Sequence, residues 1–175
     1  MPVVESSIVV DVPAAVAFAV AQTTGEVRLR WDPFIARQQF LDGATAPAKG
    51  VRTRTRHRSG LSMVSEYVSY RPPTTTGMKM VDGPWFFERL AAGWRFAQQA
   101  DGTTLATWRY SFSCRPHWLA PFAEKIGIWM LGSDIQRRID GFGRGCADPV
   151  VLAAARASLP ADDAANDQTD GGAPA

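Results

Sequence analysis

Residues 83–114 read GPWFFERLAAGWRFAQQADGTTLATWRYSFSC, and this stretch decides the fold of the chain. On both sides of Asp101-Gly102, large and polar side chains alternate, which is the period of a strand with one buried face. The face to be buried is aromatic, and its members are Trp94, Phe96, Trp108, Tyr110 and Phe112. An Asp-Gly pair between two such segments indicates a tight hairpin turn. We therefore predict two long antiparallel strands whose aromatic face needs a broad cover.

A helical pattern over residues 118–145 supplies that cover. Apolar side chains recur at intervals of three or four within residues 118–129 and again within 135–142, as on one face of an amphipathic helix. They are Trp118, Phe122, Ile126, Trp129, Ile135, Ile139 and Phe142. Asp134 and Arg138 lie four residues apart, and we interpret them as an ion pair on the solvent side of this helix.

The rest of the chain predicts five more strands and three short helices. The strands are expected at residues 3–10, 35–41, 51–58, 62–70 and 75–81, and the helices at 14–21, 25–31 and 150–159. Consecutive strands joined by short turns are neighbours in an antiparallel sheet. We expect an α+β fold, in which a seven-stranded antiparallel sheet wraps around a long C-terminal helix and two short helices separate strands 1 and 2.

The composition predicts one domain with an acidic tail. A chain of 175 residues with 46% hydrophobic residues can bury one sizeable core. We expect the domain at residues 1–147, a short helical extension at 148–159 and a disordered tail at 160–175, where every charged residue is an aspartate. The whole chain has a net charge of +2, so the part before the tail is more basic than the whole.

Cysteine use and the N-terminus predict a cytoplasmic protein. Two cysteines do not make a disulfide framework, so we expect Cys114 and Cys146 to be reduced thiols. The apolar run at residues 12–21 is far shorter than the roughly 20 residues that cross a bilayer, and MPVVESS has no basic segment of a secretory signal.

We expect no cofactor and no metal site, because the two histidines lie far apart in the sequence and no cysteine pair has ligand spacing.

Several features together resemble the START-like, or SRPBCC, superfamily of polyketide cyclase/dehydrase and lipid-transport proteins, which is related in fold to the birch pollen allergen. They are the element order, the segment VPAAVAFAV, Trp31-Asp32-Pro33, Gly83-Pro84, Trp94-x-Phe96 and the DGT turn at 101–103. The resemblance covers about residues 3–147 and implies the helix-grip fold. It does not select a function, because the superfamily includes lipid and quinone carriers, hormone receptors, cyclases and toxin-like ribosome-associated proteins.

The segment VRTRTRHR at residues 51–58 assigns the two faces of the sheet. One face holds four arginines and the other holds Thr53, Thr55 and His57. An unpaired buried charge costs several kcal/mol, so the arginines are expected to face water. The two threonines and His57 then face the concave side.

The turn after this segment allows two registers. A two-residue turn at Ser59-Gly60 brings Glu66 and Tyr70 to the concave side. A three-residue loop shifts the pairing by one residue and turns Met63 and Tyr67 inward instead. The Ser-Gly signature favours the first register.

The favoured register predicts a cavity between the sheet and the long helix. Its apolar walls are Trp94, Phe96, Trp108, Tyr110, Phe112, Ile126 and Trp129, and its polar groups are Thr53, Thr55, His57, Glu66 and Tyr70. This mixture is typical of a site for a small hydrophobic molecule with one or two oxygens. The alternative is that the rings fill a core, although polar side chains buried there without partners would be costly.

His57 and Glu66 are the candidate acid–base residues. In the favoured register they lie four positions apart along the strands, roughly 13 Å, which is too far for a hydrogen-bonded dyad. The leading hypothesis is therefore binding or transport of a small hydrophobic or amphipathic ligand such as a lipid, quinone or polyketide. The alternative is a polyketide cyclase- or dehydratase-like enzyme that uses the same cavity and either residue singly.

A third hypothesis uses the outer face of the sheet, which carries Arg52, Arg54, Arg56, Arg58, Lys79, Arg89, Arg95 and Arg109. Such a surface can attract RNA, a ribosome or an anionic membrane. Aromatic residues are not interleaved with these arginines, as a base-stacking surface requires. A solvated face that discourages edge pairing explains the pattern more simply, so nucleic acid ranks below a small ligand.

Overall fold

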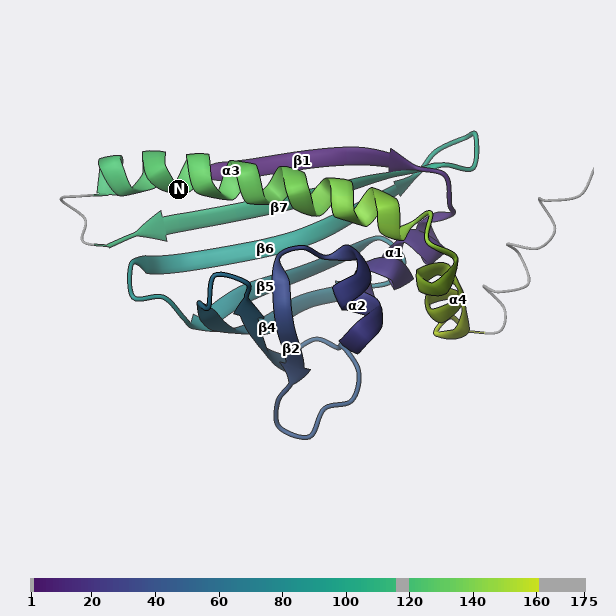
Figure 1. The fold of residues 1–175 in the computed structure, drawn as a ribbon, viewed down its shortest axis with the longest axis horizontal. Helices are drawn as coiled ribbons and strands as arrows, with labels where there is room; N and C mark the ends of the chain where they lie inside the picture. The colour runs from purple at the N-terminus through teal and green to yellow at the C-terminus, as the bar shows by residue number, and fades with distance from the viewer. Residues whose placement is uncertain (1, 116–119, 161–175) are drawn as a thin grey trace, which may run out of the picture.

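The computed structural model describes residues 2–115 and 120–160, and their side chains except at 120–131. Its body is one antiparallel sheet with the strand order β1-β7-β6-β5-β4-β3-β2 (Figure 1). The strands are β1 (Val3–Val10), β2 (Ile35–Phe40), β3 (Arg52–His57), β4 (Ser62–Arg71), β5 (Thr75–Asp82), β6 (Phe87–Gln98) and β7 (Thr104–Cys114). The predicted seven-stranded antiparallel sheet is confirmed: β2 to β7 form a meander, and β1 pairs with β7.

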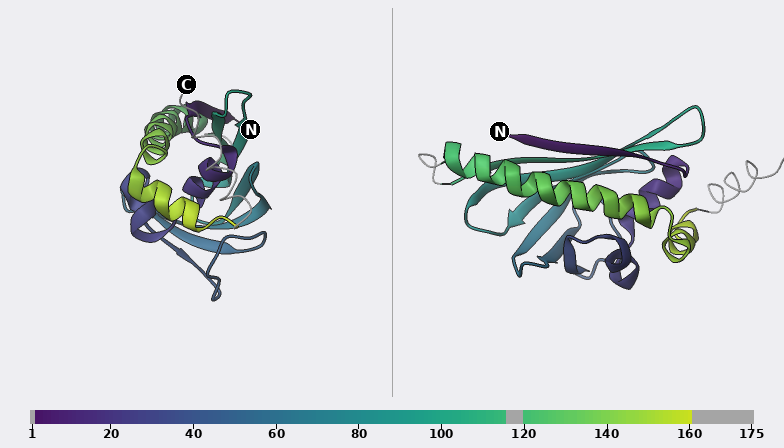
Figure 2. Two further views of the ribbon diagram at one scale, coloured as in Figure 1. Left: turned by 90° about the vertical axis from the view of Figure 1, so that its right-hand side faces the viewer. Right: turned by 45° about the horizontal axis from the view of Figure 1, so that its top comes forward.

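Four helices accompany the sheet: α1 (Ala14–Gln22), α2 (Gly25–Trp31), α3 (Ala120–Gly145) and α4 (Pro149–Ala157). The long helix α3 runs along β1 and β7, and α1 and α2 lie toward its C-terminal end, followed by α4 (Figures 1 and 2). The end-on view shows the sheet curving, with the helices on its inner side (Figure 2). This is the expected helix-grip arrangement. Apart from Pro160, the predicted tail lies outside the described residues.

The β6–β7 hairpin forms as its alternating pattern predicts. Trp94 pairs directly with Trp108 across the hairpin, and both rings are buried. The turn closes at Gly102, whose φ of 85° suits a residue without a Cβ. The Asp101 carboxylate accepts hydrogen bonds from the backbone and the hydroxyl of Thr103 and fixes the turn.

The core joins this hairpin to the helices through aromatic contacts. Phe142 of α3 lies 4.6 Å from Trp94 and 5.6 Å from Trp31, measured between ring centroids. Phe18 of α1 packs edge-on against Phe96 at 5.7 Å. Helix α3 crosses the end of α2 at Gly141, where any Cβ would meet the carbonyl oxygen of Trp31. The glycine therefore permits a close approach of the two helices.

The β3–β4 register is the three-residue alternative, so the favoured two-residue turn is wrong. His57 donates its backbone amide to the Leu61 carbonyl, which leaves three residues in the loop. Thr53 consequently pairs with Ser65, and Thr55 pairs with Met63. The local Ser-Gly signal was not decisive, because the longer loop turns Met63 rather than a carboxylate toward the interior.

The cysteines and the helices were also the subject of predictions from the sequence. Cys114 and Cys146 are both buried and are not joined in a disulfide, and burial raises the pKa of the Cys146 thiol to about 12. Among the described residues, no helix is both long and apolar enough to span a bilayer.

Candidate functional site

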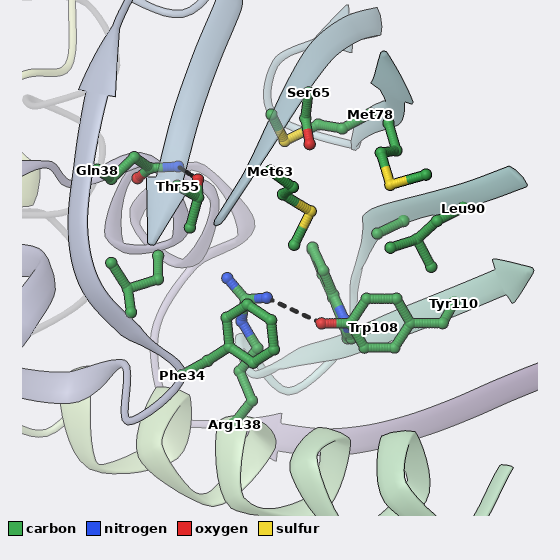
Figure 3. A pocket seen from close by; sticks show the side chains of 13 residues that line it. Phe34, Gln38, Thr55, Met63, Ser65, Met78, Leu90, Trp108, Tyr110 and Arg138 are labelled. Carbon is green, nitrogen blue, oxygen red and sulfur yellow. Dashed lines mark hydrogen bonds between the residues drawn. The ribbon is translucent and has the colours of Figure 1, made fainter. Parts of the chain in front are cut away.

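Two small cavities lie between the concave face of the sheet and α3. One has a volume of about 50 Å³ and the other about 40 Å³. Both are lined by Gln38, Met78, Trp108 and Arg138, so they are adjacent compartments of one interior region. The first is drawn in Figure 3, where Arg138 rises from α3 and the ring of Phe34 lies beside its guanidinium.

Methionines from β4 and β5 form the soft wall of the first cavity. Met63, Met78 and Met80 line it together with Leu90 and Ala92 of β6. Figure 3 shows the side chains of Met63 and Met78 directed toward Trp108 and Tyr110. Unbranched thioether side chains change rotamer readily and adapt to irregular shapes. This wall can therefore move to admit a group larger than the cavity in its present form.

A cluster of buried charges that we call the arginine pair lies beside the cavities: Arg28 of α2 and Arg138 of α3, which share Asp32. Arg138 lines both cavities, and Arg28 lines the second. Arg28 Nη2 and Arg138 Nη2 each lie 2.8 Å from Asp32 Oδ2. Arg28 and Arg138 are 6% exposed and Asp32 is 0% exposed. Asp32 follows the last turn of α2, where the Asp-Pro sequence ends the helix, and its Oδ1 accepts the Phe34 amide at 3.0 Å.

Aromatic rings hold both guanidiniums in place. Arg138 lies over Trp108 at 4.4 Å and over Phe34 at 5.0 Å, and Arg28 lies over Trp31 at 4.2 Å. Cation–π contacts of this kind strengthen when water is excluded. Arg138 Nη1 also donates to the Tyr110 hydroxyl at 3.1 Å. The arginine pair is therefore fixed by α2, α3 and β7 together.

The pKa values within the cluster follow from burial and from its charges. Burial alone raises the pKa of Asp32, but Arg138, Arg28 and the Phe34 amide together bring it below its ordinary value. Burial lowers the pKa of Arg138, yet Asp32 and Tyr110 outweigh it and the net shift is upward. For Arg28, burial outweighs the attraction of Asp32, and repulsion from Arg138 adds to it, so its pKa is lowered.

Several buried N–H groups around these cavities have no hydrogen-bond partner within the described part of the chain. They are Arg138 Nε, Trp108 Nε1 and Trp94 Nε1. Trp108 lines both cavities and Trp94 lines the second. Buried donors are normally satisfied, so each of these groups calls for an explanation.

Four of the predicted site residues line these two cavities. Trp108, Tyr110 and Thr55 line the first, and Trp94 and Trp108 line the second. Thr55 Oγ1 accepts a hydrogen bond from Gln38 at 3.3 Å. Whether any of them contacts a ligand stays a prediction.

Other predicted residues belong to the core or to another part of the interior. Phe96 and Phe112 are buried among other rings and line neither cavity. Thr53 is fully buried, and its hydroxyl has no partner among the described residues. Tyr70 does turn inward, 5.5 Å from Phe18, because a bulge between Tyr67 and Ser69 restores the face that the register shift would have reversed. The predicted contacts of Ile126 and Trp129 lie outside the described side chains.

The two acid–base candidates do not meet in the cavities. Glu66 faces outward, because the three-residue loop pairs it with Arg52 of β3 rather than with Thr53. On its other side it pairs with Lys79 of β5, whose Nζ lies 3.3 Å from the Glu66 carboxylate. His57 lies at the rim, with its ring 4.4 Å from Phe34 and its Nδ1 accepting the Ser59 amide. The placement of Glu66 in the cavity was therefore wrong, because it depended on the two-residue turn.

The sequence interpretation missed the arginine pair and Asp32. Arg138 was assigned to the solvent side with Asp134, but it is buried and bonds Asp32 instead. A signal was present: Arg138 lies three residues after Ile135 and four before Phe142, so it shares their apolar face. Asp134 instead lies 4.0 Å from His57 Nε2.

A larger groove, of about 400 Å³, lies beside α1. It is lined by Phe18, Gln22, Tyr70, the Pro72-Pro73 turn and Leu159, which follows α4. Gln22 is shared with the second inner cavity, and its Oε1 accepts the Tyr67 hydroxyl at 3.3 Å. The Tyr67–Gln22 contact thus stands between the interior region and this groove.

The basic outer face lies where the sequence predicts it. All eight of its lysine and arginine residues are exposed. Arg52 pairs with Asp42, and Lys79 pairs with Glu66. Binding of nucleic acid by this face stays a prediction.

Within the described residues, His, Cys, Asp and Glu form no group of three that could hold a metal ion.

Comparisons with known proteins agree with this fold. The sequence model for the family described as polyketide cyclase / dehydrase and lipid transport matches residues 1–145. TTHA0849 from Thermus thermophilus has a similar structure, with a TM-score of 0.67 at 14% identity over 90% of this chain and 100% of that chain. No curated protein matches the sequence.

Two further solved structures are similar at comparable levels. A START superfamily protein from Mycobacterium smegmatis has a TM-score of 0.64 at 12% identity, covering 81% of this chain and 94% of that chain. The di-domain ARO/CYC BexL from the BE-7585A biosynthetic pathway has a TM-score of 0.62 at 12% identity, covering 81% of this chain and 46% of that chain. At these identities the likeness concerns the fold.

Proposed function

The chain belongs to the polyketide cyclase/dehydrase and lipid transport family, and on this premise we propose that it binds a small amphipathic molecule between the concave face of its sheet and α3. The observation that carries the proposal is the pair of adjacent cavities that share Gln38, Met78, Trp108 and Arg138. Apolar walls with a few convergent polar groups are typical of small-molecule sites. A lipid, a quinone or a polyketide would each fit this description.

The present volumes of about 50 and 40 Å³ require the site to open around its ligand, since drug-sized molecules occupy roughly 300–1,000 Å³. The methionine wall supports such an opening, because Met63, Met78 and Met80 can repack at little expense. We infer that the ligand enlarges the interior region by displacing these side chains, while the ring-clamped Arg138 stays in place.

The carrier role is favoured over the enzymatic alternative. His57 and Glu66 line neither inner cavity, so neither candidate acid–base group is placed to act there, singly or as a pair. Asp32 is fully engaged by three guanidinium N–H groups and one amide, which leaves it unsuited to accept a proton from a substrate. The likeness to the ARO/CYC structure, at 12% identity, concerns the fold alone.

Native mass spectrometry of the protein purified from its own host tests the binding role. A co-purifying lipid, quinone or aromatic polyketide of defined mass is the expected result. Protein that carries no organic compound and that also fails to bind the neutral fluorescent probe N-phenyl-1-naphthylamine contradicts the proposal.

A cavity-filling variant locates the site. Ala92→Leu adds a side chain to the first cavity, whereas Ala91→Leu adds the same atoms on the opposite face, where Ala91 lies between Lys79 and Ser111. We expect Ala92→Leu to weaken probe binding about fivefold to 150-fold, the factor that corresponds to the usual 1–3 kcal/mol of overpacking. Ala91→Leu should bind like the unmodified protein. Equal binding by both variants would place the probe elsewhere.

A further inference from the structure

The charges of the arginine pair do not balance. Arg28 and Arg138 are both buried, and guanidinium groups do not lose their proton in proteins. Within the described part of the chain, Asp32 is the one carboxylate that either guanidinium contacts. The cluster therefore holds two positive charges against one negative charge in a region shielded from water.

The single carboxylate is also fully used. Asp32 Oδ2 accepts from Arg28 Nε at 2.9 Å, from Arg28 Nη2 at 2.8 Å and from Arg138 Nη2 at 2.8 Å. Its other oxygen accepts the Phe34 amide. Asp32 consequently has little capacity left for the remaining N–H groups of Arg138, and Arg138 Nε is the one that has no partner among the described residues.

The donors left without partners face the same interior region. Arg138 and Trp108 both line the two inner cavities, and the guanidinium lies 4.4 Å over the Trp108 ring. Trp108 Nε1 is likewise buried and has no partner in the described part of the chain. Figure 3 shows the Arg138 side chain entering the first cavity beside Tyr110. Excess positive charge and N–H donors thus coincide at one place.

We propose that the ligand of this domain is an organic acid whose carboxylate binds Arg138 beside Trp108 and supplies the negative charge that the arginine pair lacks. This inference rests on the proposed function and narrows its amphipathic molecule to one with an anionic end. The carboxylate accepts from Arg138 and Trp108, and its apolar part displaces the methionine wall. Charge-assisted hydrogen bonds in a site of low dielectric constant are the strongest that such a ligand can form.

Matched acids and alcohols test the proposal directly. Octanoate is compared with octan-1-ol, and 2-naphthoate with 2-naphthylmethanol, by isothermal titration at neutral pH and by displacement of N-phenyl-1-naphthylamine. We expect the acid of at least one pair to bind roughly tenfold to a hundredfold more tightly than its alcohol, the factor of a charge-assisted hydrogen bond. The pair that shows the larger preference distinguishes an aliphatic from an aromatic acid.

Variants test whether the preference for the acid over its alcohol comes from the buried arginine pair. Arg138→Gln should abolish it, while Arg137→Gln, the same change at the exposed neighbour on α3, should keep it. Arg28→Gln gives a second reading if Arg138→Gln does not fold, since either change leaves one guanidinium against one carboxylate. The preference should also persist when salt is raised from about 0.05 to 0.5 M, because buried charges are screened less than exposed ones.

The outcomes separate this inference from the proposed function. Equal affinity for acid and alcohol in both pairs would overturn the acid site but leave the binding role standing, and would mean that water satisfies the donors. A preference that survives Arg138→Gln and Arg28→Gln but vanishes in high salt would move the anion to the outer arginines and overturn the proposal. If neither acid binds although the protein binds N-phenyl-1-naphthylamine, the acid site is overturned and the binding role stands; if the probe does not bind and no organic compound co-purifies, both conclusions fail.

Discussion

Arginine occupies two opposite environments in this protein, and they differ in what balances its charge. On the outer face of β3, Arg52 projects into solvent, and its side chain and that of its partner Asp42 are 48% and 61% exposed. In the interior, Arg28 and Arg138 are almost fully buried and share Asp32. Water balances the first group, whereas only the protein or a bound anion can balance the second. The same residue type therefore marks a solvated surface in one place and a candidate binding site in the other.

The largest expected difference between the two environments comes from removing the acidic partner. Asp32→Asn leaves two guanidiniums buried without a counter-charge, and we expect it to lower the free energy of unfolding by about 3–5 kcal/mol. Asp42→Asn breaks the exposed ion pair with Arg52 and should cost less than about 1 kcal/mol. Asp42 has a φ of 56°, which asparagine tolerates, so the control changes charge and little else. Urea unfolding measures both, and similar losses would contradict the contrast.

The next effect concerns the junction that places Arg138 opposite Asp32. Gly141→Ala puts a methyl group against the Trp31 carbonyl oxygen, a backbone atom that cannot move aside easily. We expect a loss of about 3 kcal/mol, the upper end of the usual overpacking penalty. Gly132→Ala on the same helix meets nothing within 4 Å, and should stabilise the protein by about 0.5–1 kcal/mol through helix propensity. Thermal unfolding of the two variants should therefore shift in opposite directions.

Alkaline pH provides a third comparison, through the buried side chain of Tyr67 beside Arg28 of the arginine pair. Burial raises the pKa of Tyr67 to about 12, even though Arg28 pulls it downward. Below the ordinary value of about 10, the tyrosine is neutral in both folded and unfolded chains, and its contribution is fully present. Between pH 10 and about 12, the unfolded chain ionises first, so stability falls as pH rises.

Two phenylalanine variants test whether Tyr67 causes this loss of stability at alkaline pH. Tyr67→Phe should flatten the fall in unfolding free energy over that range. Tyr70→Phe should retain more of it, because Tyr70 is half-buried and its raised pKa has burial as its only cause. Urea unfolding at several pH values above 9 measures the slopes. An unchanged slope in Tyr67→Phe would assign the alkaline loss to other groups.

The sequence was a good guide to the fold because periodicity and turn chemistry are local. The β6–β7 hairpin, the two short helices and the long C-terminal helix all follow from patterns that neighbouring residues complete among themselves. The burial of Trp94, Trp108 and Tyr110 followed from the same alternation. These residues line the interior region because alternate residues of a strand lie on the same face of the sheet.

The candidate site was harder to predict because its determinants are non-local. Asp32 and Arg138 are 106 positions apart, and only the packing of α3 on α2 brings their side chains to 2.8 Å. The β3–β4 register depended on one extra loop residue, and that residue reversed the face of Glu66. A buried arginine also contradicts the general expectation that charges face water. Its position between Ile135 and Phe142 was the one local signal for it.

The smallest expected effect belongs to the outer face and completes the comparison. Arg54→Gln with Arg56→Gln removes two exposed charges for which the structure gives no ion-pair partner within the described residues, so stability should change by less than about 0.5 kcal/mol. The preference for octanoate over octan-1-ol should be unchanged. A solvated face also predicts equally weak binding of single-stranded RNA before and after the change. If the unmodified protein instead binds RNA with a steep salt dependence that the double variant loses, the outer arginines are a functional surface. The exposed arginines and the buried arginine pair would then both be binding sites, and burial alone would not mark the functional one.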